Sequence, residues 1–350
     1  MNEIVWIIIE ALMKVLLLVL VLQLTAAASV YLERKVSAFI QIRVGPNRVG
    51  PFGLLQPFAD VLKLFLKEDI VPDAADKFFH SLAPIISLGI ALSVWAVIPF
   101  GDYFMLGDRR ITLGVAPDVN IGILYVLAMT SLGVYGITLA GWSSNNKYSL
   151  LGGLRSAAQM ISYELSMGLS LIAVVMMVSS FSLNDMVAFQ EGWGDWKWNI
   201  FLQPIGFLIF LTSAFAETNR APFDLPEAEP ELVGGFNTEY SGMKFGMFFL
   251  AEYANVATSS ALIVLIYLGG WALPFGPEAI GLEEGSILFA LIQTLTFVLK
   301  VIFMIFFFVW VRWSIPRFRY DQLMYLGWKL LLPLSLLNAL ITAAVIVFAF

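Results

Sequence analysis

Cysteine is absent from this chain of 350 residues, and histidine occurs once, as His80. Iron–sulfur clusters are held by several thiolates, and the common zinc sites need several Cys or His ligands. The chain therefore lacks the residues for such centres, for a haem with two histidine ligands and for any disulfide. We expect no metal site in it, and any electron carrier that works with it must lie on another polypeptide.

Charged residues are also few. They make up 13% of the chain, whereas hydrophobic residues make up 59%, which lies outside the range of soluble globular domains. A glycine-rich segment, residues 45–53, lacks the Gly-Lys-Ser/Thr end of a phosphate-binding loop. We therefore expect a lipid bilayer around this chain and no nucleic acid among its partners.

Long apolar runs recur along the whole chain. A bilayer core is about 30 Å thick, so a spanning helix needs about 20 mostly apolar residues. Such runs lie near Ile4–Val30, Ser81–Phe100, Val119–Ala140, Met160–Phe181, Phe201–Ala216, Met243–Leu268, Ile287–Val311 and Trp328–Phe350. They are continuous rather than alternating in segments of about ten residues, which favours helices over a β-barrel. The sequence predicts an all-α integral membrane protein, a single domain over residues 1–350 with about eight transmembrane helices.

Positive charges are distributed unevenly between the connecting loops. The loops over residues 31–79, 142–158, 217–242 and 312–327 hold most of the 20 Lys and Arg residues. Because cytoplasmic loops collect Lys and Arg, we expect these four loops in the cytoplasm and both termini on the periplasmic side.

The first of these loops contains an amphipathic segment, Leu55–Lys67. Its residues separate at helical spacing into an apolar face, with Phe58, Val61, Leu62 and Phe65, and a charged face, with Asp60, Lys63 and Lys67. A helix of this kind can lie at the membrane surface. The charges of Arg34 and Arg43 in the same loop are either merely solvated or bind the polar head of a ligand, and the pattern alone leaves both open.

Carboxyl groups occur where a membrane helix would bury them. Glu164 and Glu252 lie inside predicted spans, and Glu217 ends another. A charge at a helix centre costs about 2.5 to 3.5 kcal/mol on insertion scales, and such residues usually mark ion or proton paths. Glu217 also opens a loop with six acids and only Arg220 to oppose them. We expect these carboxyls to exchange protons.

Three other charges fall inside predicted spans. Glu10 and Lys14 stand four residues apart and can pair on their own helix. Lys300 has no evident partner in the sequence, and His80 at a helix entry is expected at the membrane interface. None of these indicates a function by itself.

Seven motifs in order make this chain similar to a membrane subunit of respiratory complex I, the one called NADH dehydrogenase subunit 1 in mitochondria, and to its bacterial counterpart. The motifs are Glu33–Lys35, Arg43–Pro51, Leu55–Asp60, Gly141–Lys147, Ile161–Glu164, Ala216–Asp224 and Pro316–Asp321. The resemblance covers essentially the whole chain. It implies a subunit of the proton-translocating NADH:quinone oxidoreductase that is not active alone and carries no redox centre.

The resemblance also implies partners and surroundings. Quinone would be the substrate, while NADH, FMN and iron–sulfur clusters would belong to partner subunits. The expected neighbours are the quinone-site subunits of the peripheral arm and small subunits of the membrane arm, in the bacterial inner membrane or, for an organellar protein, the mitochondrial one.

Two groups of site residues follow from the same resemblance. Those expected to line the quinone chamber are Arg34, Lys35, Arg43, Asp60, Lys63 and Arg312. Those expected to couple to proton transfer are Glu164, Glu217, Asp224, Glu227, Glu229, Glu231 and Glu252.

Other interpretations of the sequence remain. The equivalent subunit of a membrane-bound hydrogenase-type complex would resemble this family without reducing quinone, although the arginine-rich first loop favours quinone. A secondary cation transporter would also use buried carboxyls, and ion flux by the isolated chain would support it. A plain scaffold predicts that neutralising Glu164 or Glu217 changes nothing in the assembled complex.

Overall fold

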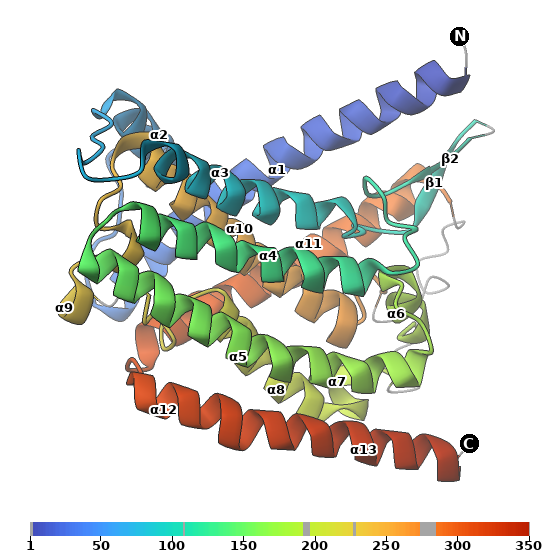
Figure 1. Cartoon of the computed structure of the whole chain (residues 1–350). Coiled ribbons are helices and arrows are strands. Elements are labelled where there is room, and N and C mark those ends of the chain that lie inside the picture. Colours follow the sequence, from blue (N-terminus) through green and yellow to red (C-terminus); the bar gives the residue numbers. More distant parts are fainter. Residues whose placement is uncertain (1–2, 108, 192–196, 227–228, 274–284, 350) are drawn as a thin grey trace.

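The computed structural model describes residues 3–107, 109–191, 197–226, 229–273 and 285–349, and it is a bundle of long helices (Figure 1). Within these ranges, seven helical segments are long and apolar enough to cross a membrane. Six are single helices, α1 (Glu3–Ile40), α3 (Lys77–Ser93), α4 (Gly122–Ser143), α5 (Lys147–Val178), α10 (Gly242–Tyr267) and α11 (Ile287–Ser314). The seventh joins α12 (Tyr320–Tyr325) to α13 (Leu332–Ala349) through a π-helical stretch, Leu326–Leu331. The predicted all-α membrane fold is confirmed.

The predicted fifth span corresponds to a shorter apolar helix, α8 (Pro204–Glu217). Its 14 residues rise about 21 Å, less than the bilayer core of about 30 Å. The remaining short helices are α2 (Gln56–Leu66), α6 (Leu183–Phe189), α7 (Asn199–Leu202) and α9 (Glu229–Leu232).

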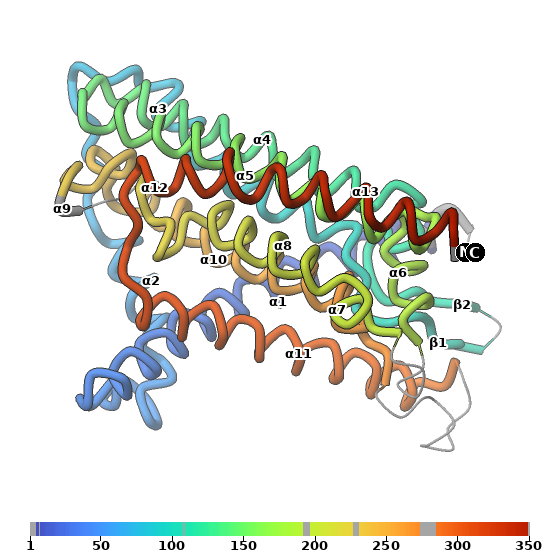
Figure 2. The backbone as a smooth tube through the Cα atoms, turned by 90° about the horizontal axis from the view of Figure 1, so that it is seen from below, coloured from blue at the N-terminus to red at the C-terminus, as the bar shows by residue number. Residues whose placement is uncertain are grey.

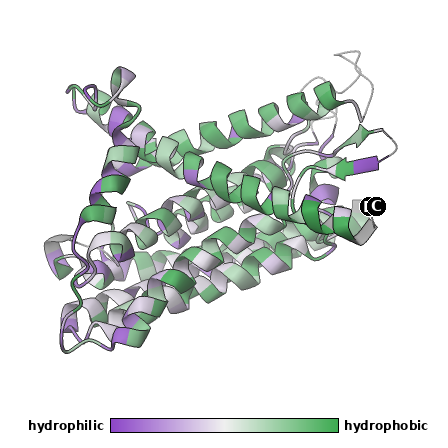
Figure 3. Ribbon diagram, turned by 90° about the horizontal axis from the view of Figure 1, so that it is seen from above, coloured by the Kyte–Doolittle hydropathy of each residue, from purple (hydrophilic) through white to green (hydrophobic). Residues whose placement is uncertain are grey.

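The helices pack in chain order on one side of the bundle and around α10 on the other. α3, α4 and α5 lie side by side, and α5 also contacts α8 and α13 (Figures 1 and 2). α10 contacts α3, α11 and α1, and every residue from Val256 to Tyr267 is buried. By contrast, α1, α11 and α13 expose many apolar side chains, which suits contact with lipid or other apolar helices. Figure 3 shows hydrophilic residues gathered mainly at the loop-rich end.

Two helices extend beyond their apolar runs. α1 continues to Ile40, ten residues past the predicted end at Val30, so Glu33, Arg34 and Lys35 lie on a helix rather than in a loop. α5 begins at Lys147, where the Asn146 side chain accepts a hydrogen bond from the Tyr148 amide at 2.9 Å. Hydropathy locates only the part of a helix that sits in lipid, and the helical hydrogen bonds continue until a residue breaks them.

The amphipathic segment after α1 is helical, as predicted, and forms α2. Asp60 on its polar face faces α1, while Phe58, Leu62 and Phe65 are exposed. The apolar face of α2 is therefore left for lipid or another chain.

A short hairpin, which the sequence patterns did not predict, joins α3 to α4. Strands β1 (Tyr103–Leu106) and β2 (Arg109–Thr112) are antiparallel, with Tyr103 opposite Thr112. The Arg110 guanidinium lies 4.1 Å from the centre of the Tyr103 ring. Strands of four residues are too short for hydropathy patterns to distinguish from a loop.

Candidate functional site

A buried charged cluster lies where α1, α10 and α11 meet the loop after α8. Its centre is Arg220, whose side chain is 5% exposed. Arg220 Nε lies 2.7 Å from Glu252 Oε1, and Nη1 lies 3.5 Å from Glu33 Oε2. The guanidinium also lies over the Tyr253 ring at 4.3 Å. One cation therefore contacts two carboxylates and an aromatic face.

Glu33 connects this cluster to α11. Arg312 Nη1 lies 2.7 Å from Glu33 Oε1, and the Tyr253 hydroxyl donates to Glu33 Oε2 at 2.7 Å. With Arg220 and Glu252, the cluster contains two guanidinium groups and two carboxyl groups. Buried ions are tolerated only when paired and hydrogen-bonded, and this balance provides the pairing.

The charge of Arg220 is secured by its surroundings. Burial lowers the pKa of the guanidinium, but the charges of Glu252 and Glu33 raise it by more, so its pKa lies above the ordinary value. Arg220 therefore stays a cation at any physiological pH.

The loop that carries Arg220 is held by α5. The buried Gln159 side chain donates from Nε2 to the carbonyl oxygens of Ala216 at 2.7 Å and Phe223 at 2.8 Å. Those two carbonyls flank Arg220, and the loop backbone also accepts from the Phe318 amide at Pro222. These hydrogen bonds hold the loop backbone and so position Arg220, although Arg220 does not lie on a helix.

The residues predicted to line a quinone chamber form separate contacts. Arg34 Nη1 pairs with Asp60 Oδ2 at 2.8 Å across α1 and α2, whereas Arg312 pairs with Glu33. Lys35 Nζ lies 5.7 Å from the Tyr31 ring centre. Arg43 and Lys63 are exposed.

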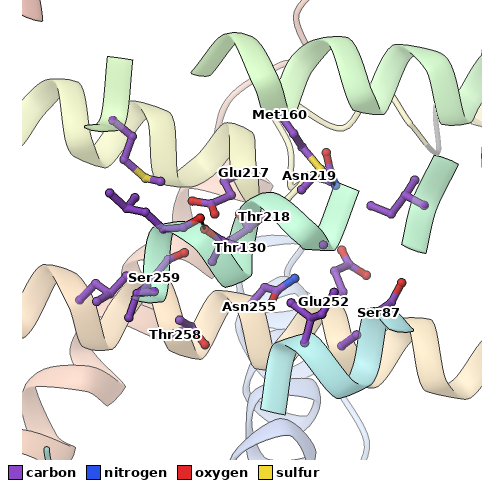
Figure 4. A pocket seen from close by; sticks show the side chains of 18 of the residues that line it. Ser87, Thr130, Met160, Glu217, Thr218, Asn219, Glu252, Asn255, Thr258 and Ser259 are labelled. Atoms are coloured by element: carbon purple, nitrogen blue, oxygen red, sulfur yellow. Dashed lines mark hydrogen bonds between the residues drawn. The ribbon is translucent and has the colours of Figure 1, made fainter. Parts of the chain in front are cut away.

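A cavity of about 70 Å³ lies beside the charged cluster, between α3, α4, α5, α8 and α10. Its polar lining includes Glu217, Asn219, Glu252, Asn255 and Thr130 (Figure 4). A buried water needs about 10 to 15 Å³ of space for its centre, so the cavity has room for roughly five waters. Glu217 and Glu252 thus share one space that suits water.

The other predicted carboxyls that the structure describes do not line the cavity. Glu164 accepts a hydrogen bond from Ser131 of α4. Asp224 pairs with Arg317 at 2.8 Å, and Glu231 pairs with Arg155 at 2.7 Å, so both belong to ion pairs near the loop-rich end. Glu227 and the side chain of Glu229 lie outside the described residues. No group of three or more His, Asp or Glu side chains that could hold a metal ion is present in the described part of the chain.

The sequence patterns did not select Glu33 or Arg220 as site residues. Glu33 was noted only as part of a motif, and its partners Arg220 and Arg312 lie far away in the chain. The signal for Arg220 was present, because it is the one cation in a loop with six acids. Lys300 does have partners, since its ammonium donates to the carbonyls of Leu268, Gly270 and Ala272 at 2.9 to 3.1 Å.

Three further titratable residues have clear surroundings. Lys14 pairs with Glu10 at 2.7 Å, as the sequence predicted. His80 is fully buried in the first turn of α3, where its ring stacks on Tyr240 with centres 4.0 Å apart.

Comparison with known proteins agrees with the sequence motifs. A family model described as NADH dehydrogenase matches residues 13–343. NADH-quinone oxidoreductase subunit 8 of Rhodothermus marinus is 55% identical over 324 residues, which cover 91% of this chain and 92% of that protein. The H subunit of the NADH-quinone oxidoreductase from Salinibacter ruber is 56% identical over 324 residues, covering 91% of each chain. One of the H subunits from Koribacter versatilis is 51% identical over 354 residues, covering 98% of each.

Proposed function

Because this chain belongs to the NADH dehydrogenase family, with relatives that are subunits of NADH-quinone oxidoreductase, we propose that it forms much of the quinone chamber of complex I and links quinone reduction to proton translocation. The chain is a multi-pass membrane subunit of that enzyme complex, and other complex I subunits are its partners. NADH, FMN and iron–sulfur clusters belong to those partners in this proposal, and the membrane is the bacterial inner membrane or its mitochondrial equivalent.

The quinone part of the proposal is supported by chemistry at the junction of α1, α2 and α11. A quinone has an apolar ring and tail with two carbonyl oxygens that accept hydrogen bonds. Arg312 is half-buried at the edge of the charged cluster, where Glu33, Arg220 and Tyr253 line a small hollow. α2 contacts α1, and its exposed apolar side chains are open to an apolar molecule near this junction.

The observation that carries the coupling part is the position of Glu252. Its carboxyl pairs with Arg220 in the charged cluster, and Glu252 also lines the cavity that contains Glu217. A change of charge near Arg312 or Glu33 therefore acts on Arg220, then on Glu252, and through the cavity on Glu217.

The interaction energy of two neighbouring charges is comparable to the energy needed to move a charge across the membrane. Two unit charges 4 Å apart interact by about 4 kcal/mol at an effective dielectric constant of 20, and each charge moved across 100 mV needs about 2.3 kcal/mol. Carboxyls that interact strongly lose their protons in steps that belong to the group, so no single Glu is assigned as the proton carrier.

The test replaces Glu217 by Gln in the intact complex. We expect NADH:quinone reductase activity or proton pumping to fall at least tenfold, while NADH oxidation with an artificial acceptor, which reports assembly, stays the same. Glu10→Gln is the matched control, because Glu10 pairs with Lys14 away from the charged cluster and the cavity. Full quinone activity and pumping in Glu217→Gln would refute the coupling role.

A further inference from the structure

Two adjacent hydroxyl residues of α4 connect the cavity to a carboxyl beside it. Thr130 lines the cavity together with Glu217 of α8, and its side chain lies beside the Glu217 carboxyl (Figure 4). The hydroxyl of Ser131, the next residue, forms a hydrogen bond with Glu164 of α5. Of these two carboxyls, Glu217 lines the cavity and Glu164 does not. Thr130 and Ser131 therefore link a carboxyl that lines the cavity to a carboxyl that does not.

Both hydroxyls have the same second acceptor. Thr130 Oγ1 lies 3.1 Å and Ser131 Oγ lies 2.8 Å from the carbonyl oxygen of Leu127. A hydroxyl has one hydrogen to donate, so each can donate either to its carboxyl or to Leu127. An ionised carboxylate only accepts and must receive that hydrogen. A protonated carboxyl donates to the hydroxyl oxygen instead, and the hydroxyl then turns to Leu127.

The Leu127 carbonyl has room for only one of them. A carbonyl oxygen has two lone pairs, and in an α-helix this oxygen already accepts from the backbone N–H of Ser131, four residues on. One further hydrogen bond remains. When Thr130 donates to Leu127, Ser131 must donate to Glu164. When Ser131 donates to Leu127, Thr130 must donate to Glu217.

We propose that Thr130 and Ser131 form a hydroxyl switch that lets Glu217 and Glu164 hold one proton between them, protonated alternately. The inference rests on the proposed coupling function and assigns to these hydroxyls a positioning role. The hydroxyls gain and lose no proton in the cycle. The proton that one carboxyl takes from water is matched by one that the other releases, and only the hydroxyl orientations exchange.

The electrostatics favours the same alternation. Glu217 and Glu164 are close enough to repel each other when both are ionised. Like charges at short range cannot both ionise without cost, and two neutral carboxyls would leave both hydroxyls competing for Leu127. Sharing one proton would avoid both the repulsion of two carboxylates and the competition of two hydroxyls for Leu127.

The experiment compares hydroxyl deletion with hydroxyl retention in the intact complex. Ser131→Ala and Thr130→Val should each lower coupled NADH:quinone activity and pumping three- to tenfold per assembled enzyme, with assembly measured by artificial-acceptor activity. Ser131→Thr and Thr130→Ser keep a hydroxyl and should stay within twofold of the parent. The double variant should be at least as active as the less active of the two single variants, because the two hydroxyls act as one unit.

Thr138→Val is the matched control on the same helix. The Thr138 hydroxyl donates only to the backbone carbonyls of Val134 and Tyr135, so its loss should leave coupling unchanged. Full activity in Ser131→Ala, no rescue by Ser131→Thr, or additive losses in the double variant would each overturn the switch. If Glu217→Gln abolishes coupling while Ser131→Ala does not, the switch fails and the proposed function stands. If Glu217→Gln is itself fully active, the proposed function fails.

Discussion

At the residue scale, the decisive side chain is Arg220. It is the cation that the acidic loop contributes, and it lies against carboxyls of α1 and α10 that are far from it in the chain. Arg220 matters less for the stabilisation that its ion pairs provide than for the destabilisation that its loss would cause, because a buried charge without a partner is strongly unfavourable.

Replacing Arg220 by Met should therefore damage the protein severely. Breaking a buried pair by removing one partner costs about 3 to 5 kcal/mol, and without Arg220 the two carboxylates of the cluster would be balanced by Arg312 as its remaining guanidinium. We expect a lower thermal stability of the complex and at least a tenfold loss of NADH:quinone activity. Arg319→Met is the control, because Arg319 and its partner Asp321 are 76% and 67% exposed and such pairs contribute about 0 to 1 kcal/mol. Equal stability of the two variants would contradict the burial argument.

The pair of Arg34 and Asp60 tests the quinone chamber. These side chains are 43% and 33% exposed, so their ion pair by itself stabilises by no more than about 1 kcal/mol. Exchanging them, as Arg34→Asp with Asp60→Arg, keeps the pair and moves the cation from α1 to α2. If Arg34 contacts quinone, the exchange should raise the KM for quinone about tenfold or more while assembly stays normal. An unchanged KM would reduce Arg34 to a structural partner of α2.

At the element scale, a glycine lets α5 approach the backbone of the segment around Gly235 closely. A Cβ built on Gly152 of α5 would lie 2.8 Å from the Phe236 amide nitrogen and 2.9 Å from the Gly235 backbone. Those contacts are with main-chain atoms, which cannot rotate away. Membrane helices commonly pack through such small residues because lipid provides no hydrophobic force between them.

Gly152→Ala should accordingly lower stability, by about 1 to 3 kcal/mol for overpacking. The matched control is Gly168→Ala on the same helix, because a Cβ there would meet nothing within 4 Å. In that open position the substitution should be neutral or stabilising by about 0.5 to 1 kcal/mol, since Ala loses less backbone freedom than Gly. Thermal unfolding of the detergent-solubilised complex measures both, and a Gly152→Ala variant as stable as Gly168→Ala would contradict the close contact.

At the scale of the whole molecule, the two termini lie at the same end of the bundle (Figures 1 and 2). Seven long helical segments and the shorter α8 make eight that run between the two ends of the bundle, and an even number brings both termini to one end. The loop-rich end with α2 and α9 is opposite. From the uneven distribution of Lys and Arg we propose that this end faces the cytoplasm.

Reporter fusions test the orientation. A periplasm-dependent phosphatase should be active when fused after Phe350, and a fluorescent protein that folds only in the cytoplasm should stay dark there. The same reporters inserted after Asp73, in the exposed segment between α2 and α3, should give the opposite result. Phosphatase activity at Asp73 would show that the charge rule fails for this chain.

The membrane class, the approximate spans, the amphipathic α2 and the family were all readable from the residues alone, because hydropathy, periodicity and short motifs are local properties. The same patterns selected Glu164, Glu217 and Glu252, since a carboxyl within an apolar run is costly wherever the helix lies. The partners of these side chains came from the packed helices. Three features join residues of different elements. They are the contacts of Arg220 with Glu33 and Glu252, the cavity shared by Glu217 and Glu252, and the hydroxyls between Glu217 and Glu164. Such contacts depend on how helices pack, and no pattern along one helix specifies which face of another it meets.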